Sequence, residues 1–151
     1  NVDDYDRALN KTGMKDAINT AVIIKNNIPA PDRIITSGAR RAVDTVNIIT
    51  NTLNIPAEFI EINDDLYLAS CEAIDSLISN ISDDIQTLYL CGHNPAFSEY
   101  ASRYIELDQI PAGGVVYISL EINTWKDIYK NKGKVVIFDY PQNYRKDNER
   151  R

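Results

Sequence analysis

The sequence is poor in the residue types that build metal centres and disulfide scaffolds. It contains one histidine, His93, and two cysteines, Cys71 and Cys91, which stand too far apart for a CxxC pair. Structural zinc and iron–sulfur sites draw several ligands from Cys and His, so we expect no metal and no other cofactor. Separated thiols without a pairing pattern are typical of a reducing compartment, and we expect a cytoplasmic protein.

Basic charge and long apolar runs are also scarce. The chain has 16 Lys and Arg residues against 22 Asp and Glu residues, a formal net charge of -6. Nucleic acids and anionic membrane surfaces bind basic faces, so we expect neither as a partner. No apolar run approaches the roughly 18–20 residues that cross a bilayer. There is no P-loop and no GxGxxG pattern, so the common nucleotide-binding signatures are absent.

Helical and strand-like periodicities alternate along all 151 residues, with no repeat and no linker. This alternation predicts a single α/β domain over residues 1–151, with helices on both faces of a mostly parallel sheet. A helix is predicted over 14–28, capped by Asn10 and closed by Pro29 and Pro31. Its apolar stripe consists of Met14, Ala17, Ile18, Ala21, Ile24 and Ile28. Further strands are expected at 33–36, 58–62, 87–91, 115–122 and 135–138, and further helices at 39–53, 72–81 and 95–104. The polar tail from Gln142 to Arg151 is expected to be frayed.

Two arginines occupy a junction between a predicted strand and a predicted helix. Arg40 and Arg41 follow the strand at 33–36 and fall in the first turn of the next helix. Cations are unfavourable at a helix N-terminus, and a broken local rule of this kind often marks a functional site. Ligands of open α/β sheets bind at the carboxyl ends of the strands, where a guanidinium can grip phosphate. The alternative interpretation is that both arginines are solvated and bind no ligand.

His93 lies in the same position relative to another strand, just beyond residues 87–91. Asn94 could cap the following helix, and Pro95 suits a first helical position. A lone histidine is often structural, but two segments here deliver Arg41 and His93 to one sheet edge. The acidic run from Asp3 to Arg7 is interpreted as a solvated loop rather than a cation site.

The order of these motifs resembles that of the SixA-type phosphohistidine phosphatases, within the histidine phosphatase superfamily. The resemblance covers nearly the whole chain. Four segments in the family's order carry it: Asp6-Arg7-Ala8-Leu9-Asn10 with Gly13, Ser37 to Thr45, Asp65-Leu66-Tyr67, and Gly92-His93-Asn94-Pro95. Within the second segment, Gly38 stands where the family usually has proline.

The resemblance implies a phosphoglycerate mutase-like three-layer α/β/α sandwich and a metal-independent phosphatase. Arg41 and His93 would be catalytic and would contact the phosphoryl group, while Ser37, Arg7 and Asn94 would help to bind the substrate. The substrate would be a phosphorylated protein carrying phosphohistidine, or a small phosphomonoester. No general acid is assigned, although Asp64 and Asp65 are the nearest candidates.

The family's nucleophile is the histidine of an Arg-His-Gly motif at the end of the first strand, upstream of Asp6. The sequence contains no such motif. We expect that this strand is missing through truncation and that the chain alone has little phosphatase activity. A natural chain that has lost its nucleophile, and binds phosphate or a protein surface, is the alternative. Loss of a central strand should expose apolar surface and an unpaired sheet edge, so we also expect marginal stability.

Overall fold

The strands form two separate sheets in a computed structural model, which describes residues 3–144. Three parallel strands make the first sheet in the order β2-β1-β3: β1 (Arg33–Thr36), β2 (Ile60–Ile62) and β3 (Leu88–Cys91). Thr36 aligns with Ile62 on one side and with Cys91 on the other. The second sheet is an antiparallel pair, β4 (Val115–Leu120) and β5 (Gly133–Asp139), with Val115 opposite Asp139. The predicted sheet is therefore divided in two.

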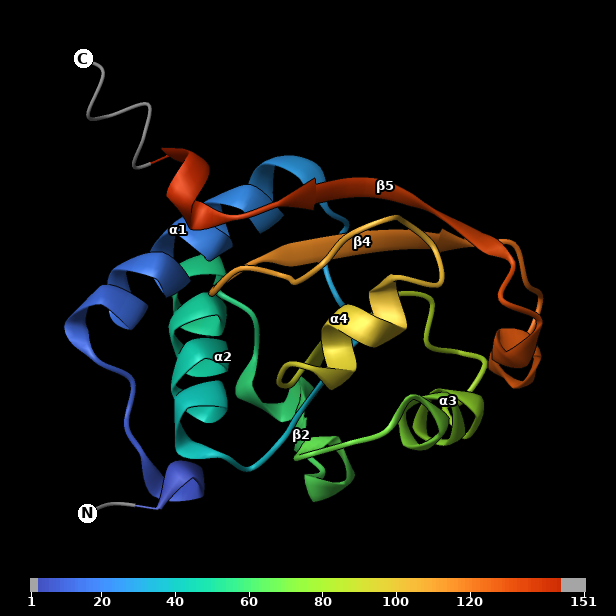
Figure 1. The fold of residues 1–151 in the computed structure, drawn as a ribbon, viewed down its shortest axis with the longest axis horizontal. Coiled ribbons are helices and arrows are strands. Elements are labelled where there is room, and N and C mark those ends of the chain that lie inside the picture. The colour runs from blue at the N-terminus through green and yellow to red at the C-terminus, as the bar shows by residue number, and fades with distance from the viewer. Residues whose placement is uncertain (1–2, 145–151) are drawn as a thin grey trace.

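Helices cover both faces of the strands (Figure 1). On one face, α1 (Lys11–Asn27) and α2 (Arg40–Leu53) pack against each other. On the other face lie α3 (Cys71–Ser79), α4 (Ala96–Ala101) and the 3-10 helix η4 (Trp125–Lys130). Three further short 3-10 helices are η1 (Asp4–Asp6), η2 (Ala57–Phe59) and η3 (Asp64–Leu66). None of the helices within residues 3–144 is both long and apolar enough to span a membrane.

Local sequence signals account for the ends of the long helices. The Asn10 side chain accepts a 2.8 Å hydrogen bond from the Gly13 N–H, which confirms the predicted cap of α1. Asn54 ends α2 in the left-handed conformation, with φ at 57°, a conformation that asparagine tolerates better than most residues. The Ser70 side chain caps α3 by accepting from the Ala73 N–H. The starts of α1 and α3 and the end of α2 therefore follow from the residue at each boundary.

Two apolar clusters make the core, one on each side of the strands. Between α1 and α2 and the sheets, Ala21, Ile24 and Ile49 pack with Tyr89 and Val115. On the opposite side, residues of α3, α4 and η4 pack against β1 and η3: Ile35, Leu66, Ile74, Ile78, Tyr100 and Ile128. This three-layer arrangement confirms the predicted α/β class.

Three details differ from the predictions. The helix after Pro95 ends at Ala101 rather than Tyr104, because the Arg103 and Tyr104 N–H groups bond three residues back and form a tight turn. Two residues of the predicted buried stripe of α1, Met14 and Ile18, are 46% and 48% exposed. Residues 141–144 form a helical turn, so the predicted frayed tail is wrong for 142–144, while 145–151 lie outside the described residues.

Candidate active site

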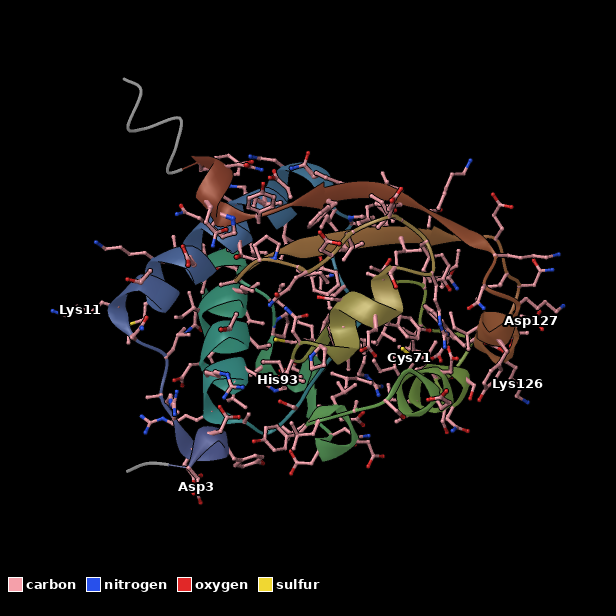
Figure 2. The ribbon with its side chains drawn as sticks, viewed as in Figure 1. Asp3, Lys11, Cys71, His93, Lys126 and Asp127 are labelled. Atoms are coloured by element: carbon pink, nitrogen blue, oxygen red, sulfur yellow. The ribbon has the colours of Figure 1, made fainter. Side chains whose placement is uncertain are left out.

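The site lies at the carboxyl ends of β1 and β3, the edge at which open α/β sheets bind ligands. Ser37 follows β1 directly and is fully buried, and His93 stands two residues beyond the end of β3. Arg41 belongs to the first turn of α2, which begins four residues after β1. The His93 ring lies between α2 and the segment around β2 in Figure 2. The predicted convergence of Arg41, His93 and Ser37 at one sheet edge is therefore present.

A chain of two hydrogen bonds links these three side chains. Arg41 Nη2 lies 3.2 Å from His93 Nδ1, and His93 Nε2 lies 2.6 Å from Ser37 Oγ. A guanidinium has donors and no acceptor, so Nδ1 must accept from Arg41. A neutral imidazole then carries its proton on Nε2, from which it donates to the Ser37 hydroxyl oxygen. The geometry thus selects one neutral tautomer of His93.

The surroundings of His93 favour this neutral form. Burial lowers its pKa below the ordinary value of 6.5, and the positive charge of Arg41 lowers the pKa further. The carboxylate of Asp4 opposes both effects and raises the pKa. A like charge beside a buried imidazole disfavours its protonation. His93 is therefore neutral at pH 7 while its Nδ1 faces Arg41.

Asp4 occupies the other side of the Arg41 guanidinium. Its Oδ1 forms a 3.0 Å ion pair with Arg41 Nη1, which also donates to the Asp4 carbonyl oxygen over 2.9 Å. The Tyr67 hydroxyl donates to Asp4 Oδ2 over 2.9 Å. The hydrogen bond from Tyr67 holds the pKa of Asp4 below its usual value, and the contacts with Arg41 act in the same direction. The acidic run at 3–7 is therefore not simply a solvated loop, because η1 brings Asp4 to the arginine.

Two tyrosines form an aromatic wall beside the histidine. The Tyr67 ring meets the His93 ring edge to face at 5.5 Å, and Tyr5 meets Tyr67 in the same way at 5.1 Å. The Tyr5 hydroxyl donates to Asp64, 3.0 Å from each carboxylate oxygen. The hydrogen bond to Asp4 raises the pKa of Tyr67, and the hydrogen bond to Asp64 raises the pKa of Tyr5. Both phenols therefore stay protonated. These rings limit the space open to a group that approaches His93.

The contacts around residue 38 explain why a glycine occupies this turn. Its N–H donates to Asp64 Oδ1 over 2.8 Å, a bond that proline could not make because it has no N–H. A Cβ at this position would lie 2.7 Å from Asp64 Oδ1 and would also meet the Tyr5 hydroxyl. Asp64 therefore holds the turn after β1 rather than pointing freely into the site.

The remaining predicted site residues lie at the periphery. Arg40 is exposed and forms only a 3.9 Å ion pair with Asp44, so the solvated interpretation holds for Arg40 and not for Arg41. Arg7 is exposed just after η1, and its charge lowers the pKa of Asp4. Asn94 does not cap α4: its amide donates to the Ile110 carbonyl over 2.9 Å and its oxygen accepts from Ser98. Pro95 precedes the first helical residue of α4 instead of occupying that position.

Sequence reasoning missed Asp4, Tyr5 and Tyr67 as members of the site. Tyr67 belongs to the Asp65-Leu66-Tyr67 segment that resembles the family motif, and its position in that segment was the only indication in the sequence. No group of three or more Cys, His, Asp and Glu side chains within residues 3–144 is arranged to hold a metal ion.

Comparisons with known proteins agree with this fold. No protein family model matches the chain. An uncharacterized protein of Mycobacterium tuberculosis is 24% identical over 92% of this chain and 92% of its own. One from Mycobacterium leprae is 28% identical over 92% of this chain and 89% of its own.

Solved structures show the same architecture. A candidate SixA phosphohistidine phosphatase from Nakamurella multipartitia superposes with a TM-score of 0.83 at 21% identity, over 93% of this chain and 88% of the other. The protein histidine phosphatase SixA in complex with tungstate superposes with a TM-score of 0.80 at 15% identity, over 95% and 90% of the two chains. The predicted resemblance is confirmed at the level of the fold: this chain has a SixA-like α/β structure.

Proposed function

We propose that this protein is a phosphatase of the histidine type that hydrolyses phosphohistidine, or another phosphomonoester, through a phosphohistidine enzyme intermediate. The observation that carries the proposal is the hydrogen-bonded chain of Arg41, His93 and Ser37 at the carboxyl edge of a SixA-like sheet. A guanidinium there provides a fixed positive charge for phosphoryl oxygens. Once an anion draws the guanidinium away, His93 is free to take a proton and add a second cation.

His93 itself is not the nucleophile in this proposal. Its Nδ1 lone pair accepts from Arg41, and its Nε2 carries the proton that Ser37 accepts, so neither nitrogen is free to attack phosphorus. Since His93 is the one histidine of the sequence, we place the nucleophile on a strand that precedes Asn1, as the family resemblance implies. The chain as printed should then bind phosphate with little turnover.

The reaction proceeds in two displacements. A ring nitrogen of the nucleophile forms an N–P bond as the substrate's N–P bond breaks, and the departing imidazole takes up a proton. Water then attacks phosphorus, which releases orthophosphate and the free nucleophile. Arg41 and protonated His93 stabilise the charge on the transferring group in both steps. An imidazole leaving group needs less help from a proton-donating side chain than an alkoxide does. The proposal therefore assigns no general acid.

The substrate favoured here is a phosphohistidine carried by a protein. The segment that connects Tyr67 to β3 contains one helix, α3, and no other helix or strand. This connection is too short to form a large lid over the site. Asp4 lies exposed at the rim of the site. A site with this little cover can admit a side chain that projects from another protein. A small phosphomonoester is the other substrate class, and the cytoplasm remains the predicted location.

A second candidate function is a non-catalytic module that binds phosphate or a protein surface. The specific observation in its favour is that the sequence holds one histidine, already engaged with Arg41 and Ser37. Reading the coding DNA upstream of Asn1 separates the two candidates. An in-frame strand that ends in Arg-His-Gly supports the phosphatase, whereas a start codon without such a histidine supports the binding module.

The phosphate site is tested with tungstate, the ion present in the solved SixA complex. Titration of the 151-residue chain, followed by the NMR signals of the His93 ring, should give saturable binding that Arg41→Ala abolishes. Arg40→Ala is the matched control, because its side chain is 64% exposed and points to Asp44. Loss of binding in both variants, or in neither, would contradict the assignment of Arg41. Robust turnover of a phosphohistidine peptide by this chain would contradict the placement of the nucleophile.

A further inference from the structure

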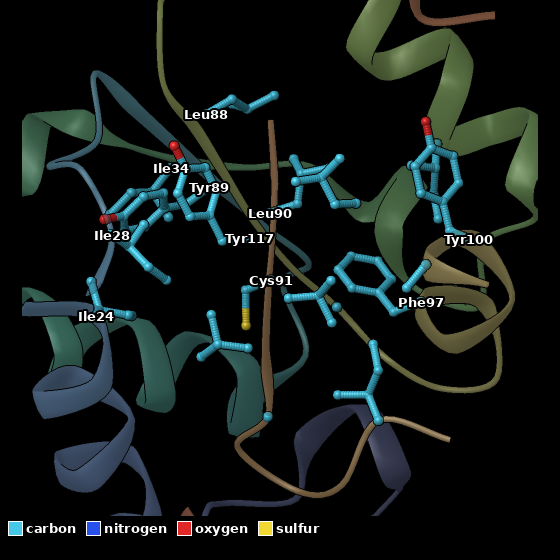
Figure 3. A pocket seen from close by; sticks show the side chains of 18 of the residues that line it. Ile24, Ile28, Ile34, Leu88, Tyr89, Leu90, Cys91, Phe97, Tyr100 and Tyr117 are labelled. Carbon is cyan, nitrogen blue, oxygen red and sulfur yellow. The ribbon is translucent and has the colours of Figure 1, made fainter. Parts of the chain in front are cut away.

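Two apolar side chains stand in solvent beside the active site. Ile62, the last residue of β2, is 58% exposed, and Leu68, just beyond η3, is 76% exposed. Leu88 and Leu90, by contrast, line a cavity of about 830 Å³ among other apolar side chains (Figure 3). Single exposed apolar residues are ordinary on a protein surface, so their backbone and their position decide whether these two have a function.

The backbone at Leu68 is strained. Its φ is 53°, in the left-handed region that asparagine tolerates and that Asn54 and Asn131 also adopt. The preceding residue, Tyr67, has φ at -85° and ψ at 122°, so the pair resembles a type II turn, whose second central position favours glycine. A large side chain in this conformation that lies mostly in solvent adds little to the core. Strain of this kind, where packing does not require the residue, points to a function outside the fold.

Contacts connect both residues to the active site. Leu68 follows Tyr67, whose ring meets the His93 ring edge to face. Ile62 lies against the turn after β1, because a Cβ at Gly38 would be 3.3 Å from Ile62 Cγ2. The two apolar side chains therefore flank η3 at the rim of the site. We call this surface the rim patch: Ile62, Asp64, Asp65 and Leu68.

The rim patch is acidic. Asp64 and Asp65 are exposed, and neither forms an ion pair within residues 3–144. The hydrogen bonds that Asp64 accepts come from neutral donors, the Tyr5 hydroxyl and the Gly38 N–H. No lysine or arginine stands between Arg41 and Arg103, a stretch of sequence that contains ten Asp and Glu residues. Negative charge therefore surrounds the apolar side chains of the patch.

This charge favours one class of phosphoryl carrier. A free phosphomonoester carries roughly 1.5 to 2 negative charges at pH 7, so the carboxylates of the rim patch repel it as it approaches Arg41. A phosphoryl group on a protein surface rich in Lys and Arg is neutralised by its own neighbours. Opposite charges on two protein surfaces also accelerate their encounter and select between partners.

We infer that the rim patch docks the protein that carries the phosphohistidine, and that this carrier presents apolar and basic side chains next to its phosphorylated residue. The inference rests on the proposed function for the identity of the phosphoryl group and adds the chemistry of the surface around it. Ile62 and Leu68 supply apolar contact, while Asp64 and Asp65 face Lys or Arg of the carrier. A small phosphomonoester reaches Arg41 without touching the patch, so the patch distinguishes the two substrate classes.

The test measures binding of a short labelled peptide by fluorescence anisotropy. The peptide carries a non-hydrolysable phosphonate analogue of phosphohistidine, flanked by Leu and Lys. Ile62→Thr should weaken its binding about five-fold, through the loss of apolar contact. Val136→Thr is the matched control, because Val136 is a β-branched strand residue with 57% exposure on β5, across the molecule from β2 in Figure 1. Tungstate affinity should stay the same in both variants.

Leu68→Asn separates docking from folding. Asparagine accepts the left-handed backbone better than leucine, so the melting temperature should stay equal or rise. Peptide affinity should nevertheless fall about ten-fold, because the apolar contact is lost. A residue that served only the fold would give the opposite pattern. Replacement of the Lys flanks by Glu should also weaken binding of the wild-type chain about ten-fold, by an amount that shrinks as salt is added.

Weaker peptide binding by both rim variants, with unchanged tungstate binding, would support the inference. Unchanged peptide affinity in both variants, equal binding of the Glu-flanked peptide, or tungstate binding without any peptide binding would overturn it. Self-association of the wild-type chain in sedimentation, abolished by Leu68→Asn, would also overturn it, because a second copy would then cover the patch.

The same measurements with Arg41→Ala separate this inference from the proposed function. If Arg41→Ala weakens binding of tungstate and peptide but the rim variants do not affect the peptide, only the docking surface fails. If the rim variants weaken peptide binding but Arg41→Ala changes neither ligand, the docking surface stands and the assignment of the phosphate site fails.

Discussion

Arg41 and His93 share a hydrogen bond of 3.2 Å between Nη2 of the guanidinium and Nδ1 of the imidazole. The bond uses the lone pair at which His93 would otherwise be protonated. A proton on Nδ1 would leave two donors and two positive charges in contact, so His93 can charge only when Arg41 moves. An anion that draws the guanidinium towards itself releases Nδ1, which couples anion binding to protonation of His93.

The first prediction concerns the titration of His93. Burial and Arg41 place its pKa below 6.5, so its ring signals should titrate below that pH. Arg41→Ala should raise the pKa of His93, whereas Arg40→Ala should leave it unchanged. Tungstate should raise the pKa in the wild-type chain. Because the folded state binds the proton less readily than the unfolded chain, His93 contributes stability above pH 6.5 that is lost as the pH falls towards its folded pKa. An unchanged titration in Arg41→Ala would contradict this coupling.

The second prediction concerns competition between Asp4 and bound anions. The Asp4 carboxylate is 3.0 Å from Arg41 Nη1, the group that we assign to phosphate. Asp4→Asn should tighten tungstate binding by about two- to five-fold, because an exposed ion pair no longer competes. It should also lower the pKa of His93, which Asp4 raises. Calorimetry measures the affinity, and Asp6→Asn, from the same 3-10 helix, is the control. Weaker tungstate binding by Asp4→Asn would mean that Asp4 positions the arginine rather than competing.

The third prediction concerns the buried carboxylate between α3 and α4. Asp75 is 5% exposed, accepts from the Tyr100 hydroxyl over 2.7 Å and pairs with Arg103 over 2.8 Å. Removal of Asp75 takes the acceptor from the Tyr100 hydroxyl and the carboxylate from Arg103, so Asp75→Ala should lower the free energy of unfolding by about 3 kcal/mol. Lys130→Ala, which breaks an exposed pair with Asp127, should cost less than about 0.5 kcal/mol. Chemical denaturation measures both, and equal losses would refute the distinction.

The fourth prediction concerns the Cys91 thiol at the end of β3. Burial raises its pKa to about 11. Only the thiolate is nucleophilic, so alkylation of Cys91 in a Cys71→Ser variant should accelerate about tenfold per pH unit from pH 7 to pH 10. Mass spectrometry follows the reaction with iodoacetamide. A plateau near pH 9 would show that the thiol is solvated, and the denatured chain provides the unperturbed reference.

The order of the elements and the edge that carries the site were predictable from the sequence. Apolar periodicity and the residues around Asn10 and Pro29 mark α1, because helix boundaries depend on side chains close in sequence. The position of Arg41 and His93 at one sheet edge followed in the same way, since parallel strands align their carboxyl ends. The short extent of α4 was missed because the turn at 102–104 continues the helical pattern with tighter hydrogen bonds.

Tertiary structure decided how the side chains at that edge meet. Periodicity and charge do not distinguish Arg40 from Arg41, and the choice of Arg41 came from the family resemblance. The packing of α2 is what turns Arg41 to His93 and leaves Arg40 in solvent. Asp4 reaches Arg41 across 37 positions, a contact that no local pattern encodes. The division of the strands into two sheets likewise depends on which strands pair. Local structure is determined by neighbours along the chain, whereas a site depends on contacts that form only when distant segments pack together.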